Sequence, residues 1–316
     1  MKRIIALALA VLMLVSLAAC GGSGSGKYKV GICQLVQHPA LDAATQGFQD
    51  ALTKQLGDKV EFDVQNASGE PANCTTIVNG FVASKVDLIM ANATPALQAA
   101  KEATATIPIL GTSVTDYASA LEIDGWTGTV GTNISGTSDL APLDGQAAMI
   151  KELFPDAKTV GILYCSSEAN SQYQVDVITG HLTDLGFTVT PYSFTDTNDV
   201  ASVAQKACDS DVIYIPTDNT AASNTEAIAN VVLPAKVPVV AGEAGICQGC
   251  GVATLSISYY DLGYATGLMA AKVLTGEAKI SEMPVQYAPE FTKQYNAANC
   301  DALGITIPGD YTPLEG

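Results

Sequence analysis

Residues 127–146 read TGTVGTNISGTSDLAPLDGQ and lie near the middle of a chain of 316 residues. The stretch is rich in glycine, threonine, serine and asparagine, so it can be extended or can bend, and it offers hydroxyl and backbone N–H groups. A helical pattern follows it. Pro142 suits a first helical turn, where its missing N–H is not needed, and apolar residues then recur at helical spacing. We therefore interpret this stretch as the first crossover between two similar lobes that face each other across a cleft.

Short apolar segments alternate with helical patterns on both sides of this stretch, and the second half repeats the order of the first. The matched segments are separated by nearly constant offsets: 29–32 with 159–162, 56–57 with 185–186, 87–90 with 211–214, and 107–110 with 237–240. Strands that alternate with helices are typical of a parallel sheet covered on both faces. The sequence thus predicts an α/β protein of two Rossmann-like lobes, each built on a parallel sheet.

The chain after residue 257 most simply returns to the first lobe and then crosses once more. It contains an amphipathic helical pattern around Leu262 and Met269 and a last apolar strand near 285–287. Three crossovers would form a hinge that allows the lobes to open and close but resists twisting. The predicted division is 27–135 and 258–283 for the first lobe, and 136–257 and 284–316 for the second.

The first residues have the pattern of an export signal. Lys2 and Arg3 precede an apolar run over 4–17, which is short for a membrane span. The run ends in LAAC, which resembles the lipobox of bacterial lipoproteins. This resemblance implies a signal peptide over 1–19, lipidation of Cys20 and a flexible linker over 20–26. An ordinary secretory signal is the alternative.

The composition excludes several classes of function. The formal net charge at pH 7 is −17, and no basic patch is present that would neutralise phosphates, so we expect no nucleic-acid partner. The chain contains no G-x-S-x-G elbow, no P-loop and no G-x-G-x-x-G motif after a strand. We therefore predict that the protein is not an enzyme and needs no cofactor.

Eight cysteines leave an odd number for pairing once Cys20 is set aside. Cys247 and Cys250 form a C-x-x-C in what reads as a glycine-rich loop, for which a local disulfide and two separate thiols both stay open. A metal site is disfavoured because the chain has only two histidines. Cys33 and Cys165 fall at the ends of predicted strands, where we interpret them as core thiols.

The candidate binding residues follow from the predicted sheets. Ligands of open parallel sheets bind beyond the carboxyl ends of the strands, and two facing lobes place two sets of such loops around one cleft. The side chains of these loops are mostly hydroxyls, amides and carboxylates. We predict the ligand-binding residues to be Gln37, His38, Asn92, Thr94, Ser113, Thr115, Asp116, Ser138, Asn170, Asp218, Asn219, Glu243 and Tyr259.

The two kinds of polar group in these loops match the two ends of an α-amino acid. Hydroxyls and helix N-termini can hold a carboxylate, for which the candidates are Ser113, Thr115 and Ser138. Carboxylates can pair with an ammonium group, for which the candidates are Asp116, Asp218 and Glu243.

A second interpretation exists for each of these residues, because Asp, Ser, Thr and Asn are also the usual helix caps in such loops. We interpret Asp139, just before the helix of Pro142, mainly as a cap. His38 is equally well explained as an ordinary loop residue. Tyr259 either covers an apolar ligand body or packs against the first lobe.

Essentially all of the chain after the linker resembles the substrate-binding lipoproteins of ABC transporters that include tryptophan and tyrosine binders. The resemblance is carried by GICQLVQHPALDAATQGFQDAL (31–52), GTSVTD (111–116), GTSDLAPLDGQ (136–146), AKTVGILYCSSEANSQ (157–172), DVIYIPTDNT (211–220), PVVAGE (238–243) and LGITIP (303–308).

This resemblance implies a type I periplasmic-binding-protein fold and a monomer at the extracytoplasmic face of the membrane. It also implies a small solute, most simply an aromatic amino acid, that is delivered to the transmembrane permease of an importer. A receptor for a membrane signalling partner and a binder of a sugar or nucleoside are the alternatives.

Overall fold

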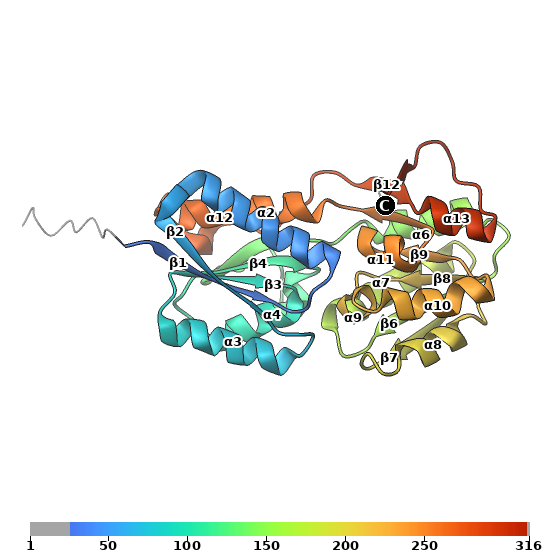
Figure 1. Ribbon diagram of the computed structural model, residues 1–316, viewed down its shortest axis with the longest axis horizontal. Coiled ribbons are helices and arrows are strands. Elements are labelled where there is room, and N and C mark those ends of the chain that lie inside the picture. Colours follow the sequence, from blue (N-terminus) through green and yellow to red (C-terminus); the bar gives the residue numbers. More distant parts are fainter. Residues whose placement is uncertain (1–25, 315–316) are drawn as a thin grey trace, which may run out of the picture.

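The computed structural model describes residues 26–314, which form two lobes side by side along the long axis of the molecule (Figure 1). Each lobe contains one sheet with helices on both faces. The predicted signal peptide and Cys20 lie outside the described residues, as does nearly all of the linker. In the part of the chain that the structure describes, no helix is long and apolar enough to cross a membrane.

The first lobe contains a parallel sheet of strand order β11-β5-β4-β3-β1-β2. Its strands are β1 (Tyr28–Gln34), β2 (Val60–Asn66), β3 (Leu88–Asn92), β4 (Ile109–Val114), β5 (Ile134–Ser138) and β11 (Gln286–Tyr287). Its helices are α2 (Pro39–Leu56), α3 (Pro71–Ser84), α4 (Thr94–Ala103), α5 (Tyr117–Leu121) and α12 (Tyr259–Leu274), with 3-10 turns η1 (Gly57–Lys59) and η2 (Ile280–Glu282). A proline in the first turn of α2, α3 and α4 fixes the helical φ early, so these helices begin close to the strand ends.

The second lobe contains a sheet of strand order β13-β12-β10-β9-β8-β6-β7. Its strands are β6 (Thr159–Cys165), β7 (Thr188–Phe194), β8 (Val212–Ile215), β9 (Val239–Ala241), β10 (Ala253–Ser256), β12 (Thr292–Tyr295) and β13 (Thr312–Pro313). Its helices are α6 (Leu143–Leu153), α7 (Ala169–Asp184), α8 (Val200–Ala207), α9 (Asn219–Ala222), α10 (Thr225–Ala235), α11 (Ala244–Cys250) and α13 (Ala297–Leu303). The β10–β12 pair is antiparallel, an exception to the predicted parallel sheet.

The chain passes between the two sheets after β5, after β10 and after β11, as the three-crossover prediction requires. The predicted boundaries differ from the strand pairing by a few residues. The division at 135/136 falls inside β5, and the division at 283/284 assigns β11 to the second lobe. Both strands pair within the first sheet, so a division by sheet follows Ser138 and Tyr287.

Helix α12 belongs to the first lobe because it packs closely on α2, beside which it lies in Figure 1. Three glycines make this close approach possible: Gly47, Gly263 and Gly267. A Cβ on Gly47 would lie 2.1 Å from the carbonyl oxygen of Tyr260, and one on Gly263 would lie 1.9 Å from that of Ala44. The chain therefore re-enters the first lobe through a tight helix pair before it reaches the third crossover.

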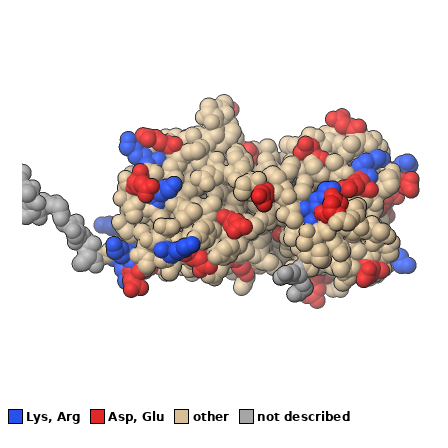
Figure 2. Space-filling model, turned by 90° about the horizontal axis from the view of Figure 1, so that it is seen from above, with Lys and Arg blue, Asp and Glu red and all other residues tan. Residues whose placement is uncertain are grey.

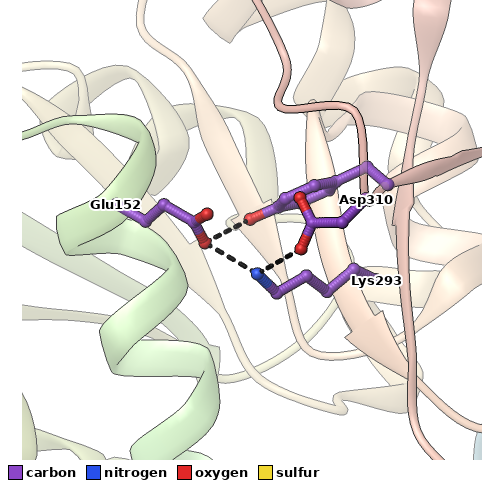
Figure 3. A network of polar contacts seen from close by, with 4 residues as sticks. Glu152, Lys293 and Asp310 are labelled. Atoms are coloured by element: carbon purple, nitrogen blue, oxygen red, sulfur yellow. Dashed lines mark hydrogen bonds and ion pairs between the residues drawn. The ribbon is translucent and has the colours of Figure 1, made fainter.

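The C-terminal segment is fastened to α6 by the charged cluster in Figure 3. The Lys293 ammonium lies 2.9 Å from a carboxylate oxygen of Glu152 and 2.9 Å from one of Asp310. The Tyr311 hydroxyl donates to the same oxygen of Glu152 at 3.0 Å. Because Lys293 lies at the start of β12, this cluster anchors the third crossover where it enters the second lobe.

The cysteine pair lies in a different element from the one predicted. Cys247 and Cys250 belong to helix α11 and not to a glycine-rich loop, and both are buried free thiols. The local reason is Glu243, whose carboxylate caps the first turn so that the short helix forms despite its two glycines. Within the described residues, no group of three or more His, Cys, Asp and Glu is arranged to hold a metal ion.

Candidate ligand-binding site

The predicted binding residues lie in loops and first helical turns where the two lobes face each other. Asn92 ends β3, Thr94 begins α4, and Ser113 lies near the end of β4. Eleven of the thirteen predicted side chains are buried: His38, Asn92, Thr94, Ser113, Thr115, Ser138, Asn170, Asp218, Asn219, Glu243 and Tyr259. Gln37 is exposed and Asp116 is half-buried, so these two lie at the edge of the site.

Five of these residues have a buried polar atom without a hydrogen-bond partner among the described residues. The atoms are His38 Nδ1, Asn92 Oδ1, Thr94 Oγ1, Ser113 Oγ and Asn170 Oδ1. Leaving one such group unsatisfied costs about 1–3 kcal/mol. Native proteins leave few of them, and those that occur need an explanation. Their concentration between the lobes indicates a site that is completed by a polar ligand.

The amide of Asn92 is held in one orientation by a chain of hydrogen bonds. Gln34 Nε2 donates to Asp42 Oδ1 at 2.6 Å, and Thr45 Oγ1 donates to Gln34 Oε1 at 2.7 Å. Asn92 Nδ2 then donates to Thr45 Oγ1 at 3.0 Å and to the Leu41 carbonyl at 2.8 Å. Both N–H groups of the amide are used, so Asn92 Oδ1 is a fixed acceptor without a donor among the described residues.

Glu168 organises the facing loop of the second lobe. Its carboxylate accepts from the backbone N–H and the amide of Asn219 at 3.1 and 2.7 Å, and from the N–H and hydroxyl of Thr220 at 2.8 and 2.7 Å. Asn170 Nδ2 donates to Glu168 at 3.1 Å and to the Thr217 carbonyl at 3.2 Å. Asn170 Oδ1 is thereby left as a second fixed acceptor.

His38 joins the two lobes directly. Its Nε2 lies 3.3 Å from Asn219 Oδ1. Because the Asn219 amide nitrogen donates to Glu168, the oxygen faces His38, and the network assigns the proton to Nε2. Nδ1 is then a third acceptor without a donor. Burial lowers the pKa of His38, against smaller opposing effects of Asn219, Glu168 and Asp42, which favours this neutral form.

The carboxylates of Asp116 and Glu243 are engaged as helix caps. Asp116 accepts from the backbone N–H and hydroxyl of Ser119 at the start of α5. Glu243 accepts from the N–H groups of Gly245 and Ile246 at the start of α11. Burial raises the pKa of Glu243 to about 7. The capping interpretation thus accounts for the contacts of both side chains.

Asp218 caps α9 and also ties together the loops around it. It accepts from the N–H of Ala221 at 2.8 Å, the N–H of Cys165 at 2.6 Å and the hydroxyl of Ser171 at 2.7 Å. Burial, and then the nearby charge of Glu168, raise the pKa of Asp218 to about 7.

The interpretation of Asp139 as a cap is wrong. Helix α6 begins at Leu143, with Pro142 in the capping position, because the chain stays extended beyond Asp139 as it crosses the hinge. The buried carboxylate of Asp139 instead accepts from Thr115 Oγ1 at 3.1 Å and from the hydroxyl of Tyr259 at 2.9 Å. Asp139 therefore ties the first crossover to Thr115, just after β4, and to Tyr259, where the second crossover ends.

The backbone of the first lobe is strained at this site. Ala93, before α4, has φ 90° and ψ 159°, and Ser113 has φ 53°. Such conformations of non-glycine residues cost about 1–3 kcal/mol each and concentrate at functional sites. No side chain of the described residues caps α4, so its first N–H groups and the Thr94 hydroxyl form a site suited to an anion.

A cavity of 190 Å³ opens between the lobes beside the Glu168 network. Its walls come from both lobes and include Val36 and Pro95 on one side and Glu168, Asn219 and Thr220 on the other. Glu168 is the central residue of its network, and the sequence analysis did not single it out. Its only sequence signal is its place in the loop between β6 and α7.

Two Rossmann-like lobes, three crossovers and a polar cleft between the strand ends define a type I periplasmic-binding-protein fold and the class of two-lobed solute receptors. Residues 29–312 match the family described as ABC transporter substrate binding protein, and the chain belongs to this family. Its function is therefore that of an extracytoplasmic solute receptor of an ABC transporter, which confirms the predicted fold and receptor role.

Individual relatives agree with this assignment. The chain is 35% identical over 280 residues to a tyrosine-binding protein of Clostridioides difficile. The match covers 87% of this chain and 81% of the relative. A domain from Streptococcus pneumoniae in complex with L-Trp has a TM-score of 0.86 at 34% identity, over 90% of this chain and 97% of that one. A ligand-free, open substrate-binding protein with adhesive properties from Clostridium difficile has a TM-score of 0.70 at 38% identity. The match covers 91% of this chain and 99% of that one.

Proposed function

We propose that the protein binds an aromatic amino acid, tyrosine or tryptophan, between its lobes and delivers it to the permease of an ABC importer. We also propose that Cys20 anchors it to the membrane through a lipid and that it acts as a monomer. The single observation that carries the ligand assignment is the pattern of buried polar atoms without partners among the described residues.

These atoms divide into two chemical groups. The acceptors His38 Nδ1, Asn92 Oδ1 and Asn170 Oδ1 are fixed by their own networks, and an ammonium group carries three N–H donors. The hydroxyls of Thr94 and Ser113 can donate, and they lie beside the uncapped start of α4, where a carboxylate is favoured. An α-amino acid supplies both groups on one carbon atom.

The relatives support the aromatic class and the liganded arrangement. Those named for a ligand bind tyrosine or L-Trp. The structure has a higher TM-score with the L-Trp complex than with the ligand-free, open protein, although its sequence is less similar to the former. The burial of the site is consistent with lobes that have closed as they do around a ligand.

The test is isothermal titration calorimetry on protein that lacks residues 1–26, which leaves both lobes complete. We expect binding of tyrosine or tryptophan and at least a hundredfold weaker binding of tyramine, which lacks the carboxylate. The same loss is expected for 3-(4-hydroxyphenyl)propionate, which lacks the ammonium group. Binding of a sugar or nucleoside without any binding of an amino acid would refute the proposal.

A further inference from the structure

A second cavity lies at the hinge. It has a volume of 320 Å³ and is lined by Thr137 of β5, by the start of α12 and by residues 286–290 and 292, which run from β11 through the third crossover to the start of β12. It shares no lining residue with the cavity between the lobes. None of the predicted ligand-binding residues lines it either, so it is separate from the candidate ligand site.

The lining combines an apolar surface with two carboxylates. Leu262 and Ala265 of α12 and the ring of Tyr287, which is 53% exposed, supply apolar area. Asp261 and Glu290 supply the charge, and no lysine, arginine or histidine is among the lining residues of this described cavity. Neither carboxylate is in an ion pair within residues 26–314.

The surrounding surface has the same sign of charge. Figure 2, which looks onto the side of the molecule where α12 and β12 lie, shows acidic side chains over the middle of this face and basic ones mainly toward its two ends. A cation near the two carboxylates would meet little competing positive charge.

The cavity spans a part of the molecule that must deform when the lobes move. Asp261 is held in the first lobe by the packing of α12 on α2, whereas Thr292 pairs with Ser256 in the second sheet. Glu290 lies in the connection between them. Rotation of the lobes changes the distance between Asp261 and Glu290, so a molecule that contacts both binds the open and closed forms with different affinity.

A chain of contacts also links this cavity to the cleft. Ser258 lines the cavity, and the next residue, Tyr259, donates its hydroxyl to Asp139, which in turn accepts from Thr115. A shift of the first turn of α12 therefore moves a hydrogen bond that reaches the predicted ligand site.

We propose that the hinge cavity is a second binding site for a small organic amine with a flat apolar body. The amine contacts Asp261, Glu290 and Tyr287, and its binding stabilises the closed arrangement of the lobes. The amine pairs with the carboxylates and the body lies against Leu262, Ala265 and the tyrosine ring. An occupant that contacts both Asp261 and Glu290 in this arrangement of the lobes stabilises it and so increases affinity at the cleft. Linkage requires that the cleft ligand increase affinity for the amine by the same factor.

The test uses 2-phenylethylamine as the probe and needs no cleft ligand. Its affinity is measured by calorimetry for the wild type, for the double variant Asp261→Asn/Glu290→Gln and for Asn170→Ala. We expect the hinge variant to bind at least tenfold more weakly, and the cleft variant to bind at least as tightly as the wild type, because it removes an unpaired acceptor from the closed cleft. The neutral analogue 2-phenylethanol should bind at least tenfold more weakly than the amine. The matched control Glu277→Gln removes an exposed carboxylate just beyond α12 and should have no effect.

Three outcomes would overturn the proposal: no binding of the amine up to 10 mM, equal binding by the hinge variant, or loss of binding in Asn170→Ala. The last would place the amine in the cleft. The coupling is then measured as the affinity for tyrosine or tryptophan with and without saturating amine. We expect at least a twofold increase in the wild type and none in the hinge variant. Because the binding step is measured without an amino acid, failure of the proposed cleft ligand leaves this result interpretable.

Discussion

Acidification should weaken ligand binding through one side chain, His38. In the closed form this imidazole is buried, its Nε2 faces Asn219, and its pKa is lowered by burial despite Glu168 and Asp42 nearby. When the lobes open, the ring reaches solvent and its pKa returns to about 6.5. Closure must therefore release a proton whenever the pH is below that value. Affinity is complete above the open-form pKa and is lost as the pH falls through it.

The size of the effect follows from the same linkage. In the limit where closed His38 binds no proton, affinity falls tenfold for each pH unit below about 6.5. Between pH 7.0 and 5.5 the loss is then about eightfold, or about 1.2 kcal/mol. Asp218 and Glu243 also titrate near this range, with pKa values of about 7. Their hydrogen bonds lie within the second lobe, so they should titrate alike in both forms and contribute little to the difference.

The assay is the dissociation constant of the amino-acid ligand measured by calorimetry in steps from pH 7.0 to 5.5. His38→Gln should bind with reduced affinity at pH 7.0 and show no pH dependence below it. His181→Gln is the matched control, because His181 is the other histidine of the chain and lies near the end of α7. A wild-type affinity that stays constant to pH 5.5, or a pH dependence that survives in His38→Gln, would refute the role assigned to His38.

Three further predictions concern affinity and folding. Asn92→Ala and Asn170→Ala should each lower ligand affinity by about 1–3 kcal/mol in calorimetry, because each removes an acceptor that the protein itself leaves unpaired. Each should also lower the melting temperature in the absence of ligand, because each amide donates to buried acceptors of its own lobe. Gly263→Ala should destabilise the folded protein by at least about 2 kcal/mol in urea unfolding, because its Cβ would meet backbone atoms of α2. Gly80→Ala is the matched control: its Cβ would have open space on α3, so this variant should stabilise the protein by about 0.5–1 kcal/mol. Lys293→Met should lower the free energy of unfolding by no more than about 1 kcal/mol and leave ligand affinity unchanged, because the ion pairs of Lys293 are partly exposed and lie within the second lobe. A large loss of affinity would instead show that this anchor of the third crossover controls closure.

The sequence pattern was sufficient to predict the lobes and the loops that face the cleft. The apolar run of β3 ends at Asn92, and Pro95 marks the first turn of the next helix. A buried parallel strand followed at once by a helix places the intervening polar residues at the carboxyl edge of the sheet. Asn92 and Thr94 could therefore be named from local pattern alone.

The missed features depend on contacts between distant segments. Glu168 resembles an exposed acidic residue at a helix start, and its burial comes from Asn219 and Thr220, about 50 residues away. Strand β12 reads TKQY without an apolar pattern and becomes a strand through its pairing with β10. Asp139 has the spacing of a cap, but the extended hinge keeps it out of the helix. No local rule of propensity contains these long-range pairings.

The unsatisfied atoms of the cleft give a physical reason for closure to depend on ligand. In an open form, water can satisfy His38 Nδ1, Asn92 Oδ1, Thr94 Oγ1, Ser113 Oγ and Asn170 Oδ1. Closing the empty cleft buries all five without partners among the described residues, at a cost of about 1 kcal/mol or more for each. The direct bond between His38 and Asn219 returns only about 1 kcal/mol. The lower estimate of the penalty, about 5 kcal/mol, is close to the roughly 5.5 kcal/mol that moves a two-state equilibrium from 1:99 to 99:1. A ligand that supplies the missing donors and acceptors removes this penalty, so the same atoms that select the ligand also set the closed population to which a permease would respond.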